Sequence, residues 1–222
     1  MSETKKGLFV VFTGAPGCGK GTQARILKEK THICHLSTGE MLREYAAQDT
    51  PLGRDLKALL DKGEFATDEM IIEMVRNRIG QPDCEHGFIL DGFPRTLPQA
   101  EVLESLLAEK GIKLTCVLEI QVPDEIIMER ILGRYSCLKC GAGYHDKFQK
   151  PKVYGVCDVC GGTEFGRRKD DNRATVQNRL VNYRLLTYPT IPFFEKRGLL
   201  RTVDGTGTIE AVSHKIDEIL GI

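Results

Sequence analysis

The glycine-rich segment at residues 14–22, GAPGCGKGT, constrains the fold of this chain more than any other feature. It directly follows the apolar run 8–13 and directly precedes a segment with helical spacing, 20–30. Residues 14–20 fit the pattern G-x-x-x-x-G-K in the strand–loop–helix context that this phosphate-binding motif requires. Glycines let backbone N–H groups curl around phosphate oxygens, the helix N-terminus adds positive potential, and Lys20 supplies a mobile charge. The segment therefore predicts a nucleotide-phosphate site.

The whole loop is expected to line the ATP site, with the residues Gly14, Ala15, Pro16, Gly17, Cys18, Gly19, Lys20, Gly21 and Thr22. The alternative is a glycine-rich turn with a surface lysine, and the flanking strand and helix argue against it. Most such loops place a Ser or Thr directly after the lysine to hold magnesium, but here Gly21 stands there and Thr22 follows. We therefore do not expect that hydroxyl to ligate magnesium directly. Cys18 is expected to pack inside the loop.

Short apolar runs alternate with longer segments of helical spacing. The runs suit buried strands of a parallel sheet and lie at 8–13, 88–90, 114–122, 199–203 and, more weakly, 33–36. The helical segments lie at 20–30, 39–47, 52–62, 68–79, 97–109, 124–134, 175–186 and 209–220. This alternation predicts an α/β fold with three layers, in which helices flank a parallel sheet on both sides. The length of 222 residues allows one domain, with or without an insertion.

The charges of the chain balance, because 31 basic residues face 31 acidic ones. No overall field therefore draws it to nucleic acid or to an anionic membrane, and any anion site must be local. The first residues form a short polar segment without the features of a signal or transit peptide, and no apolar stretch approaches the roughly 20 residues that span a bilayer. We expect a soluble cytoplasmic protein with no nucleic-acid or membrane partner.

From 135 to 167 the helical pattern gives way to glycines, cysteines and short apolar pieces, which predicts a small inserted module. Cys137 and Cys140 form one C-x-x-C pair, Cys157 and Cys160 form a second, and 16 residues separate the two pairs. This spacing is typical of a closed tetrahedral zinc site with a structural role. Two disulfides or four free thiols are the alternatives. The remaining cysteines outside the loop, Cys34, Cys84 and Cys116, are isolated in sequence and are expected to pack in the core.

Five motifs in order give a resemblance over nearly the whole chain: GAPGCGKGTQ at 14–23, LSTGEMLR at 36–43, ILDGFPRTLPQA at 89–100, ERILGR at 129–134 and RKDD at 168–171. With them the chain resembles the nucleoside monophosphate kinases, and among these the adenylate kinase family in its long-lid, zinc-bearing form. The resemblance implies a Mg²⁺-dependent enzyme that catalyses ATP + AMP = 2 ADP as a monomer. It also implies a P-loop core at 1–134 and 168–222, an AMP-binding helical segment at about 37–66 and a lid at 135–167.

The resemblance also implies roles for individual residues. On the donor side, Arg130 would stack on the ATP adenine, Gly207 would lie near that base, and Asp91 would orient magnesium through its waters. The AMP site would consist of Thr38, Gly39, Arg43, Gly92, Arg95, Gln99, Arg168 and Arg179, with Gln99 hydrogen-bonding the adenine edge. The catalytic group would comprise Lys20, Asp91, Arg95, Arg134, Arg168 and Arg179. Asp170 and Asp171 would help to hold the closed arrangement.

Three other functions compete with this interpretation. A regulatory GTPase also uses such a loop, but the sequence has no N/T-K-x-D motif to read guanine. A zinc-ribbon nucleic-acid binder would use the basic residues at 167–169, and the neutral overall charge argues against it. A kinase for UMP, CMP or GMP is the nearest alternative, and Thr38 and Gln99 favour AMP as acceptor. Whether ATP or GTP is the preferred donor stays open.

Overall fold

The centre of the molecule is a five-stranded parallel sheet with strand order β2-β3-β1-β4-β8. The structure, a computed structural model, describes residues 7–62, 64 and 66–222. The strands are β1 (Leu8–Thr13), β2 (Cys34–Ser37), β3 (Gly87–Asp91), β4 (Cys116–Gln121) and β8 (Leu200–Asp204). The expected α/β fold with a parallel sheet is thereby confirmed.

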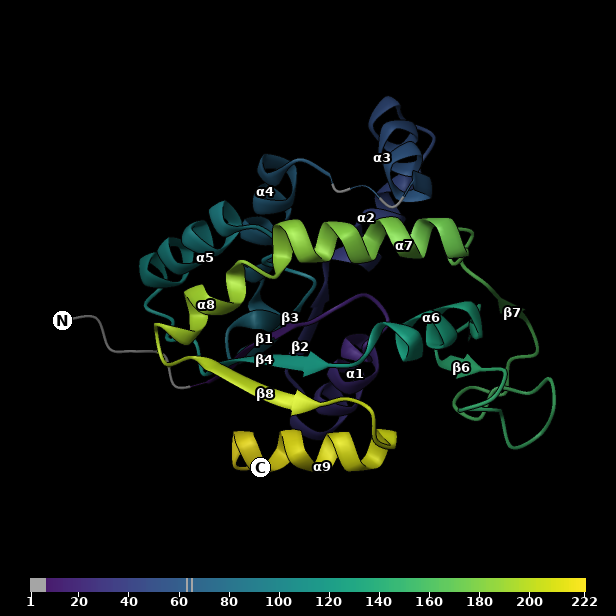
Figure 1. The fold of residues 1–222 in the computed structure, drawn as a ribbon. Helices are drawn as coiled ribbons and strands as arrows, with labels where there is room; N and C mark the ends of the chain where they lie inside the picture. Colours follow the sequence, from purple (N-terminus) through teal and green to yellow (C-terminus); the bar gives the residue numbers. More distant parts are fainter. Residues whose placement is uncertain (1–6, 63, 65) are drawn as a thin grey trace.

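Helices cover both faces of this sheet (Figure 1). One face carries α1 (Lys20–Thr31) and α9 (Ile209–Leu220), and the other carries α4 (Asp68–Ile79), α5 (Leu97–Glu109) and α8 (Thr190–Glu195). Beyond them lie α2 (Thr38–Ala46), α3 (Pro51–Lys62), α6 (Asp124–Leu132) and α7 (Arg173–Asn182). A 3₁₀ turn, η1 (Pro82–Cys84), precedes β3, and a π-helical segment, η2 (Tyr183–Thr187), follows α7.

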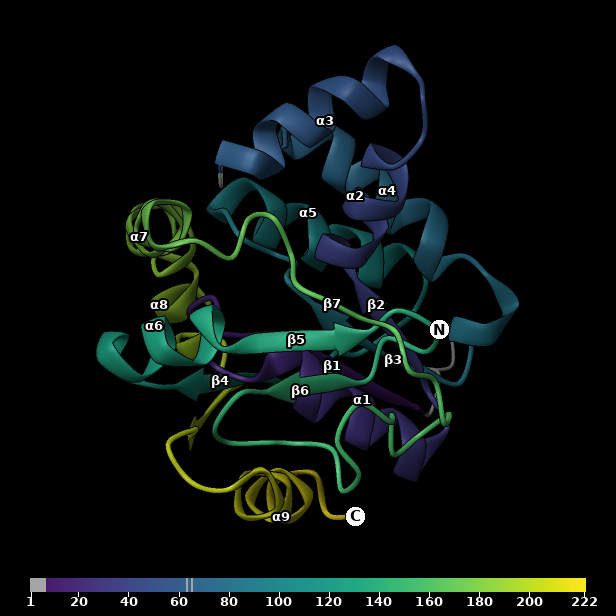
Figure 2. The ribbon, with the colours of Figure 1, turned by 90° about the vertical axis from the view of Figure 1, so that its right-hand side faces the viewer.

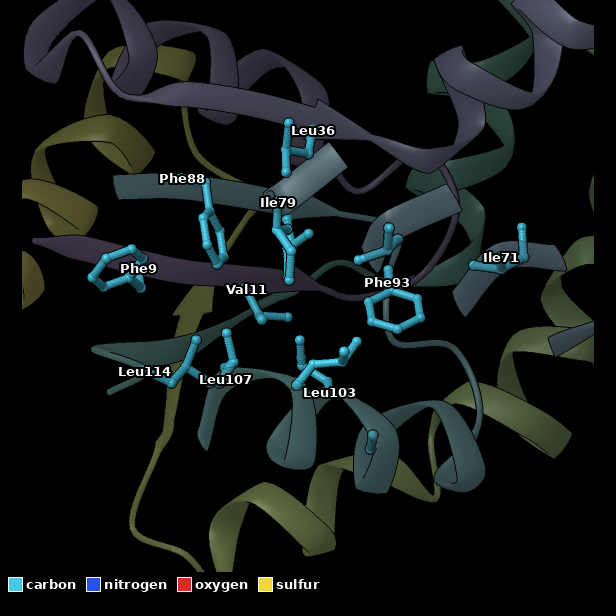
Figure 3. Packing of buried hydrophobic residues seen from close by; sticks show 14 of the residues in the cluster. Phe9, Val11, Leu36, Ile71, Ile79, Phe88, Phe93, Leu103, Leu107 and Leu114 are labelled. Carbon is cyan, nitrogen blue, oxygen red and sulfur yellow. The ribbon is translucent and has the colours of Figure 1, made fainter. Parts of the chain in front are cut away.

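The central strands are apolar along most of their length because both of their faces are buried. Along β1, Phe9 and Val11 belong to the cluster beneath α4 and α5, whereas Val10 and Phe12 belong to the cluster beneath α1 and α9. Figure 3 shows the first cluster, in which the side chains of β1 and β3 meet those of α4 and α5. The two clusters hold the sheet from its two faces. Polar loops follow the carboxyl ends of its strands.

Residues 134–166 add a second, three-stranded antiparallel sheet with order β6-β5-β7. Its strands are β5 (Arg134–Cys137), β6 (Gly143–His145) and β7 (Phe165–Gly166). We call residues 135–167 the lid segment. Figure 2 looks onto it and shows β5 and β6 in front of the central sheet, between α7 and α9 in the view.

Most expected elements are present, but three differ. The helix expected over 124–134 ends at Leu132, because Gly133 caps it and Arg134 begins β5. The helix expected over 175–186 is α7 followed by η2, and α8 was not expected. Within the described parts of the chain, no helix is both long and apolar enough to cross a bilayer.

Candidate active site

A cavity of about 1160 Å³ opens at the carboxyl edge of the central sheet. It is lined by the P-loop, by the segments that follow β2, β3 and β8, and by the lid segment. Ligands of open α/β sheets bind at this edge, where loops and helix N-termini converge. The cavity is therefore the candidate active site.

The P-loop wraps around the ammonium group of Lys20. Its Nζ donates to the carbonyl oxygens of Gly14 (2.7 Å) and Ala15 (2.9 Å) and lies 3.4 Å from the Sγ of Cys18. Gly14 has a φ of 131°, and a Cβ there would lie 2.5 Å from the carbonyl oxygen of Ile120. A side chain at this position would therefore collide with β4, which explains why the motif needs glycine here.

Asp91, at the end of β3, lies beside the loop. Its Oδ2 is 3.3 Å from the Nε2 of His35 on the neighbouring strand β2. Burial acts to raise the pKa of Asp91, but the hydrogen bond with His35 and the positive charge of Lys20 outweigh it and lower the pKa. Asp91 is thus a buried carboxylate beside a phosphate loop, which is the kind of group that positions hydrated magnesium.

Partly buried arginines line the cavity opposite the loop. Burial lowers the pKa of Arg95 to about 10 and that of Arg168 to about 10, and it also lowers the pKa of Arg43. The Nε of Arg95 donates to the carbonyl oxygen of Gly92 (2.7 Å). Guanidinium groups taken from water and placed near one another repel, so a polyphosphate in this cavity would relieve an electrostatic cost.

Acidic residues partly compensate this charge. Asp171, whose side chain is 3% exposed, accepts two hydrogen bonds from Arg134, the shorter of them at 2.5 Å. Asp170 accepts a hydrogen bond from Arg179. The acidic pair therefore contacts two of the arginines assigned to the catalytic group, and it lies three residues after the end of the lid segment.

On the β2 and β3 side, Thr38 begins α2 and its Oγ1 donates to the carbonyl oxygen of Gly92 (2.9 Å). Gly92 has a φ of 82°, and a Cβ there would come within 2.8 Å of both Thr38 and Arg95. Gln99, in the first turn of α5, is buried and accepts from the backbone N–H of Arg95 through its Oε1 (2.7 Å). These groups form one wall of the cavity.

On the β8 side, Arg130 of α6 bridges two loops. It donates to the carbonyl oxygen of Gly205 (2.8 Å) and to that of Cys18 (3.4 Å). Gly207 lies close by in the segment between β8 and α9 and lines the cavity. The guanidinium group therefore spans the P-loop and the segment at which the donor base was expected.

The structure brings the residues predicted for the nucleotide and catalytic sites to one cavity, with a single exception among them. Ala15 does not line the cavity, because its side chain packs with Ile127 and Ile131 beneath the loop. The others that line it are Gly14, Pro16, Gly17, Cys18, Gly19, Lys20, Gly21, Thr22, Thr38, Gly39, Arg43, Asp91, Gly92, Arg95, Gln99, Arg130, Arg134, Arg168, Arg179 and Gly207.

Two residues of the site were not expected from the sequence. His35 reaches Asp91, and Asp68 accepts from the Nε2 of Gln99 (2.7 Å). Helical spacing placed Asp68 at the start of a helix, but nothing in the sequence indicated its partner.

The four cysteines of the lid segment form a compact cluster. The Sγ atoms of Cys137, Cys140, Cys157 and Cys160 all lie within 4.8 Å of one another. Gly141 and Gly161 follow the two pairs with φ of 72° and 67°, and each donates its N–H to the first cysteine of its pair. This arrangement suits tetrahedral coordination by four thiolates.

Two lid residues that line the cavity also make structural contacts. The hydroxyl of Tyr144 donates to the Sγ of Cys157 (3.3 Å), and this bond is the main cause that lowers the pKa of Cys157 to about 6. The Nδ1 of His145 accepts from the N–H of Lys147 (3.0 Å), and its Nε2 lies 3.1 Å from the carbonyl oxygen of Glu129. Tyr144 thus supports the cysteine cluster, and His145 joins the lid segment to α6.

Cys34 and Cys84 pack in the core cluster, as expected, and they also contact each other. Their Sγ atoms lie 2.6 Å apart, and Asp83 is close enough to complete a group of three possible ligands. However, Arg78 donates to the Sγ of Cys84 (3.2 Å) and pairs with Asp83. The guanidinium group occupies the place of a cation, so we assign no metal to this group.

Comparison with known proteins agrees with the geometry. The family model described as adenylate kinase matches residues 12–199. The chain is 51% identical to an adenylate kinase of Paramagnetospirillum magneticum over 95% of its own length and 97% of that protein. It is 50% identical to adenylate kinases of Allorhizobium ampelinum and Carboxydothermus hydrogenoformans, over 95% of this chain and 98% of each relative. The chain therefore belongs to the adenylate kinase family and is a nucleoside monophosphate kinase.

Proposed function

We propose that this enzyme catalyses the reversible, Mg²⁺-dependent reaction ATP + AMP = 2 ADP. The observation that carries the proposal is a single cavity in which Lys20 and the P-loop form one wall and Arg43, Arg95 and Gln99 form another. Two phosphate-bearing substrates can lie side by side only if their mutual repulsion is neutralised. Partly buried cationic groups on both sides of one space meet that requirement.

In this proposal the P-loop, Arg130 and Gly207 hold ATP. Thr38, Gly39 and Gly92 line the acceptor pocket, and Arg43 and Arg95 hold the acceptor phosphate, because a planar guanidinium group can donate to two phosphate oxygens at once. Gln99 faces the acceptor base. Arg134, Arg168 and Arg179 surround the transferred group. This reaction needs no covalent nucleophile, so the residues act by positioning and by stabilising charge.

Two metals fit the residues present. Asp91 is a buried carboxylate beside Lys20, and it would hold the waters of a magnesium ion. That ion, when bound with ATP, neutralises charge on the β- and γ-phosphates. The clustered thiols of Cys137, Cys140, Cys157 and Cys160 would hold zinc. Four cysteines leave no open coordination position, so the proposed zinc is structural.

We also propose that the chain is divided into a P-loop core at 1–134 and 168–222, an AMP-binding helical segment at about 37–66 and a lid at 135–167. The lid would close over both nucleotides and exclude water, which competes as phosphoryl acceptor. Arg168 supports this role, because it lies directly after the lid segment and lines the same cavity as Lys20. We further propose a cytoplasmic monomer, since its eight cysteines suit a reducing compartment. Gel filtration with light scattering tests the oligomeric state.

The first experiment is the initial rate of ADP formation from Mg-ATP with AMP, GMP, CMP, UMP or water in turn as acceptor. We expect a high rate with AMP alone. A preference for another monophosphate would overturn the assignment of Thr38 and Gln99, and phosphate release with water alone would contradict the kinase assignment of the cavity.

Two variants test the residue roles. Lys20→Ala and Arg95→Ala should each lower turnover by about 10²–10³, because each removes a charge that stabilises the transferred group. The exposed Lys28→Ala, on the same helix as Lys20, is the control. Normal turnover in a correctly folded Lys20→Ala or Arg95→Ala enzyme would rule out the assigned role.

A further inference from the structure

The side-chain amide of Gln99 is held at both ends. Its Nε2 donates to the Oδ1 of Asp68 (2.7 Å), and its Oε1 accepts from the backbone N–H of Arg95 (2.7 Å). A carboxylate can only accept and a backbone N–H can only donate, so the chemistry of the partners fixes which end of the amide is oxygen. The opposite orientation would set two donors against each other and two acceptors against each other.

Asp68 is itself held in place. It is the first residue of α4, and its Oδ2 accepts from the hydroxyl of Thr96 (2.8 Å). Thr96 is the N-cap of α5 and accepts from the N–H of Gln99. The carboxylate therefore bonds both to the Gln99 amide and to the residue that starts the Gln99 helix, so it cannot turn away without losing both contacts.

The orientation of this amide matters because nucleobases differ in their hydrogen-bonding edge. A 6-amino purine offers a donor at position 6 and an acceptor at N1, whereas a 6-oxo purine offers an acceptor and then a donor. A glutamine amide can match either edge, since a half-turn exchanges its oxygen and nitrogen. Each end of the Gln99 amide retains capacity for one more hydrogen bond, because Oε1 has a second lone pair and Nε2 a second hydrogen.

We propose that Asp68 is a positioning residue that sets the base preference of the acceptor site. By holding Gln99 in one orientation, it makes the site accept 6-amino monophosphates and reject 6-oxo monophosphates. The inference rests on the proposed function, in which Gln99 faces the acceptor base. A 6-oxo base would either face mismatched groups or force the amide to turn against Asp68 and Arg95. Buried mismatches of this kind discriminate strongly between substrates.

The test compares kcat/KM for AMP and for IMP with Mg-ATP as donor, using the full chain. IMP is a 6-oxo purine without a 2-amino group, so the pair isolates positions 6 and 1. Asp68→Asn should lower the AMP-to-IMP ratio at least about tenfold, mainly through a rise for IMP, because an asparagine amide can donate to a turned Gln99. The matched control is Glu69→Gln, which removes the same charge from an exposed position in the same helical turn and should leave the ratio within about twofold.

Asp68→Ser is a second variant in case Asp68→Asn folds poorly. A serine suits the first turn of a helix, and its hydroxyl both donates and accepts, so the ratio should fall again. If both variants lower kcat/KM for AMP and IMP in the same proportion, Asp68 only stabilises α4 and the inference is wrong.

Gln99→Leu separates this inference from the proposed function beneath it. Loss of the amide should remove most of the discrimination between AMP and IMP. An unchanged ratio in Gln99→Leu would mean that Gln99 does not read the base, and the proposed acceptor site would fail. A ratio that falls in Gln99→Leu but not in either Asp68 variant would overturn the role of Asp68 alone.

Discussion

The central sheet and the lid segment are stabilised in different ways. In the sheet, Phe9 and Phe88 are fully buried and pack edge to face, with ring centroids 5.1 Å apart. In the lid segment the buried cluster is small, while Leu138, Val159 and Tyr154 expose 65%, 72% and 99% of their surface. Burial of apolar surface can hold the sheet, but it cannot hold the lid segment.

The lid segment instead relies on its cysteines and on a repeated backbone pattern. Cys137 and Cys157 each donate their N–H to the carbonyl oxygen five residues later, at Ala142 and Gly162, and each accepts from the glycine four residues later. The two turns present their thiols to one centre. Because the two regions are stabilised differently, we expect that the lid segment can unfold while the core stays folded. Four experiments test this expectation.

Removal of the proposed metal centre should have the largest effect. Structural zinc contributes about 10–16 kcal/mol to the folding of small zinc peptides at neutral pH. Cys157→Ala should abolish zinc binding, speed amide exchange in the lid segment and lower turnover by about 10², because Arg134 and Arg168 would lose their positions. Metal analysis, hydrogen exchange and kinetics measure these effects.

The control for this variant is Cys116→Ala, at a buried cysteine of β4 outside the cluster. It should retain zinc and normal exchange in the lid segment. If Cys157→Ala instead abolished the main thermal transition, the two regions would form one cooperative unit and the comparison would be wrong.

Truncation in the core should have the opposite pattern. Phe88→Ala should lower the free energy of unfolding by about 3–5 kcal/mol, because it leaves a cavity between the sheet and its helices. Zinc content should not change. Urea titration with metal analysis tests both statements. Tyr154→Ala, at a fully exposed lid position, is the control and should change stability by less than about 0.5 kcal/mol.

Acid should weaken the two regions at different pH. The pKa of Cys157 is lowered from 9.0 to about 6. In the metal-free protein, the Cys157 thiolate therefore stabilises the lid segment fully above pH 9, and this stabilisation is lost as the pH falls through 6. The pKa of Asp91 is lowered from 3.8. The Asp91 carboxylate therefore stabilises the core above pH 3.8, and this stabilisation is lost only as the pH falls below that value.

Hydrogen exchange of the metal-free protein between pH 9 and pH 3 should therefore show the lid segment weakening first. Exchange rates need correction for their intrinsic dependence on pH. Tyr144→Phe, which removes the hydroxyl that bonds to Cys157, should reduce the pH dependence of the lid segment and leave that of the core unchanged. A core that weakened at the higher pH would contradict the assignment of these groups.

The smallest effect should come from a contact between the two regions. Arg25 of α1 donates to the carbonyl oxygen of Gly141 (2.8 Å). Arg25→Ala should favour opening of the lid segment by about 0.5–1.5 kcal/mol, the net value of one hydrogen bond. Single-molecule distance measurements between lid and core report this change. Arg54→Ala, which removes an exposed ion pair with Asp49, should leave lid opening unaltered.

Elements with local signals could be predicted from the sequence. The helices α4, α5 and α9 span the expected residues. Each begins after a threonine whose hydroxyl accepts a hydrogen bond from the backbone N–H three residues later. The strands of the lid segment are two to four residues long and have no alternation to detect. Pro189 and Pro192 hid α8 from the helical pattern.

The site was predictable only where a motif carries it. The P-loop and the assigned arginines other than Arg179 came from contiguous motifs that the structure brings to one cavity. The contact of His35 with Asp91 joins residues 56 apart and depends on the strand order β2-β3. The contact of Asp68 with Gln99 joins two helix starts 31 residues apart. Such pairs follow from tertiary packing, and no local pattern encodes them.

The position of Lys20 has a consequence for how the P-loop meets its substrate. The ammonium group of Lys20 already donates to the carbonyl oxygens of Gly14 and Ala15. These bonds hold the loop in its ring-shaped conformation. An arriving phosphate therefore exchanges partners with a lysine that is already in place and does not have to organise the loop. A flat guanidinium group could not sit in this ring, so arginine is no substitute for lysine at position 20.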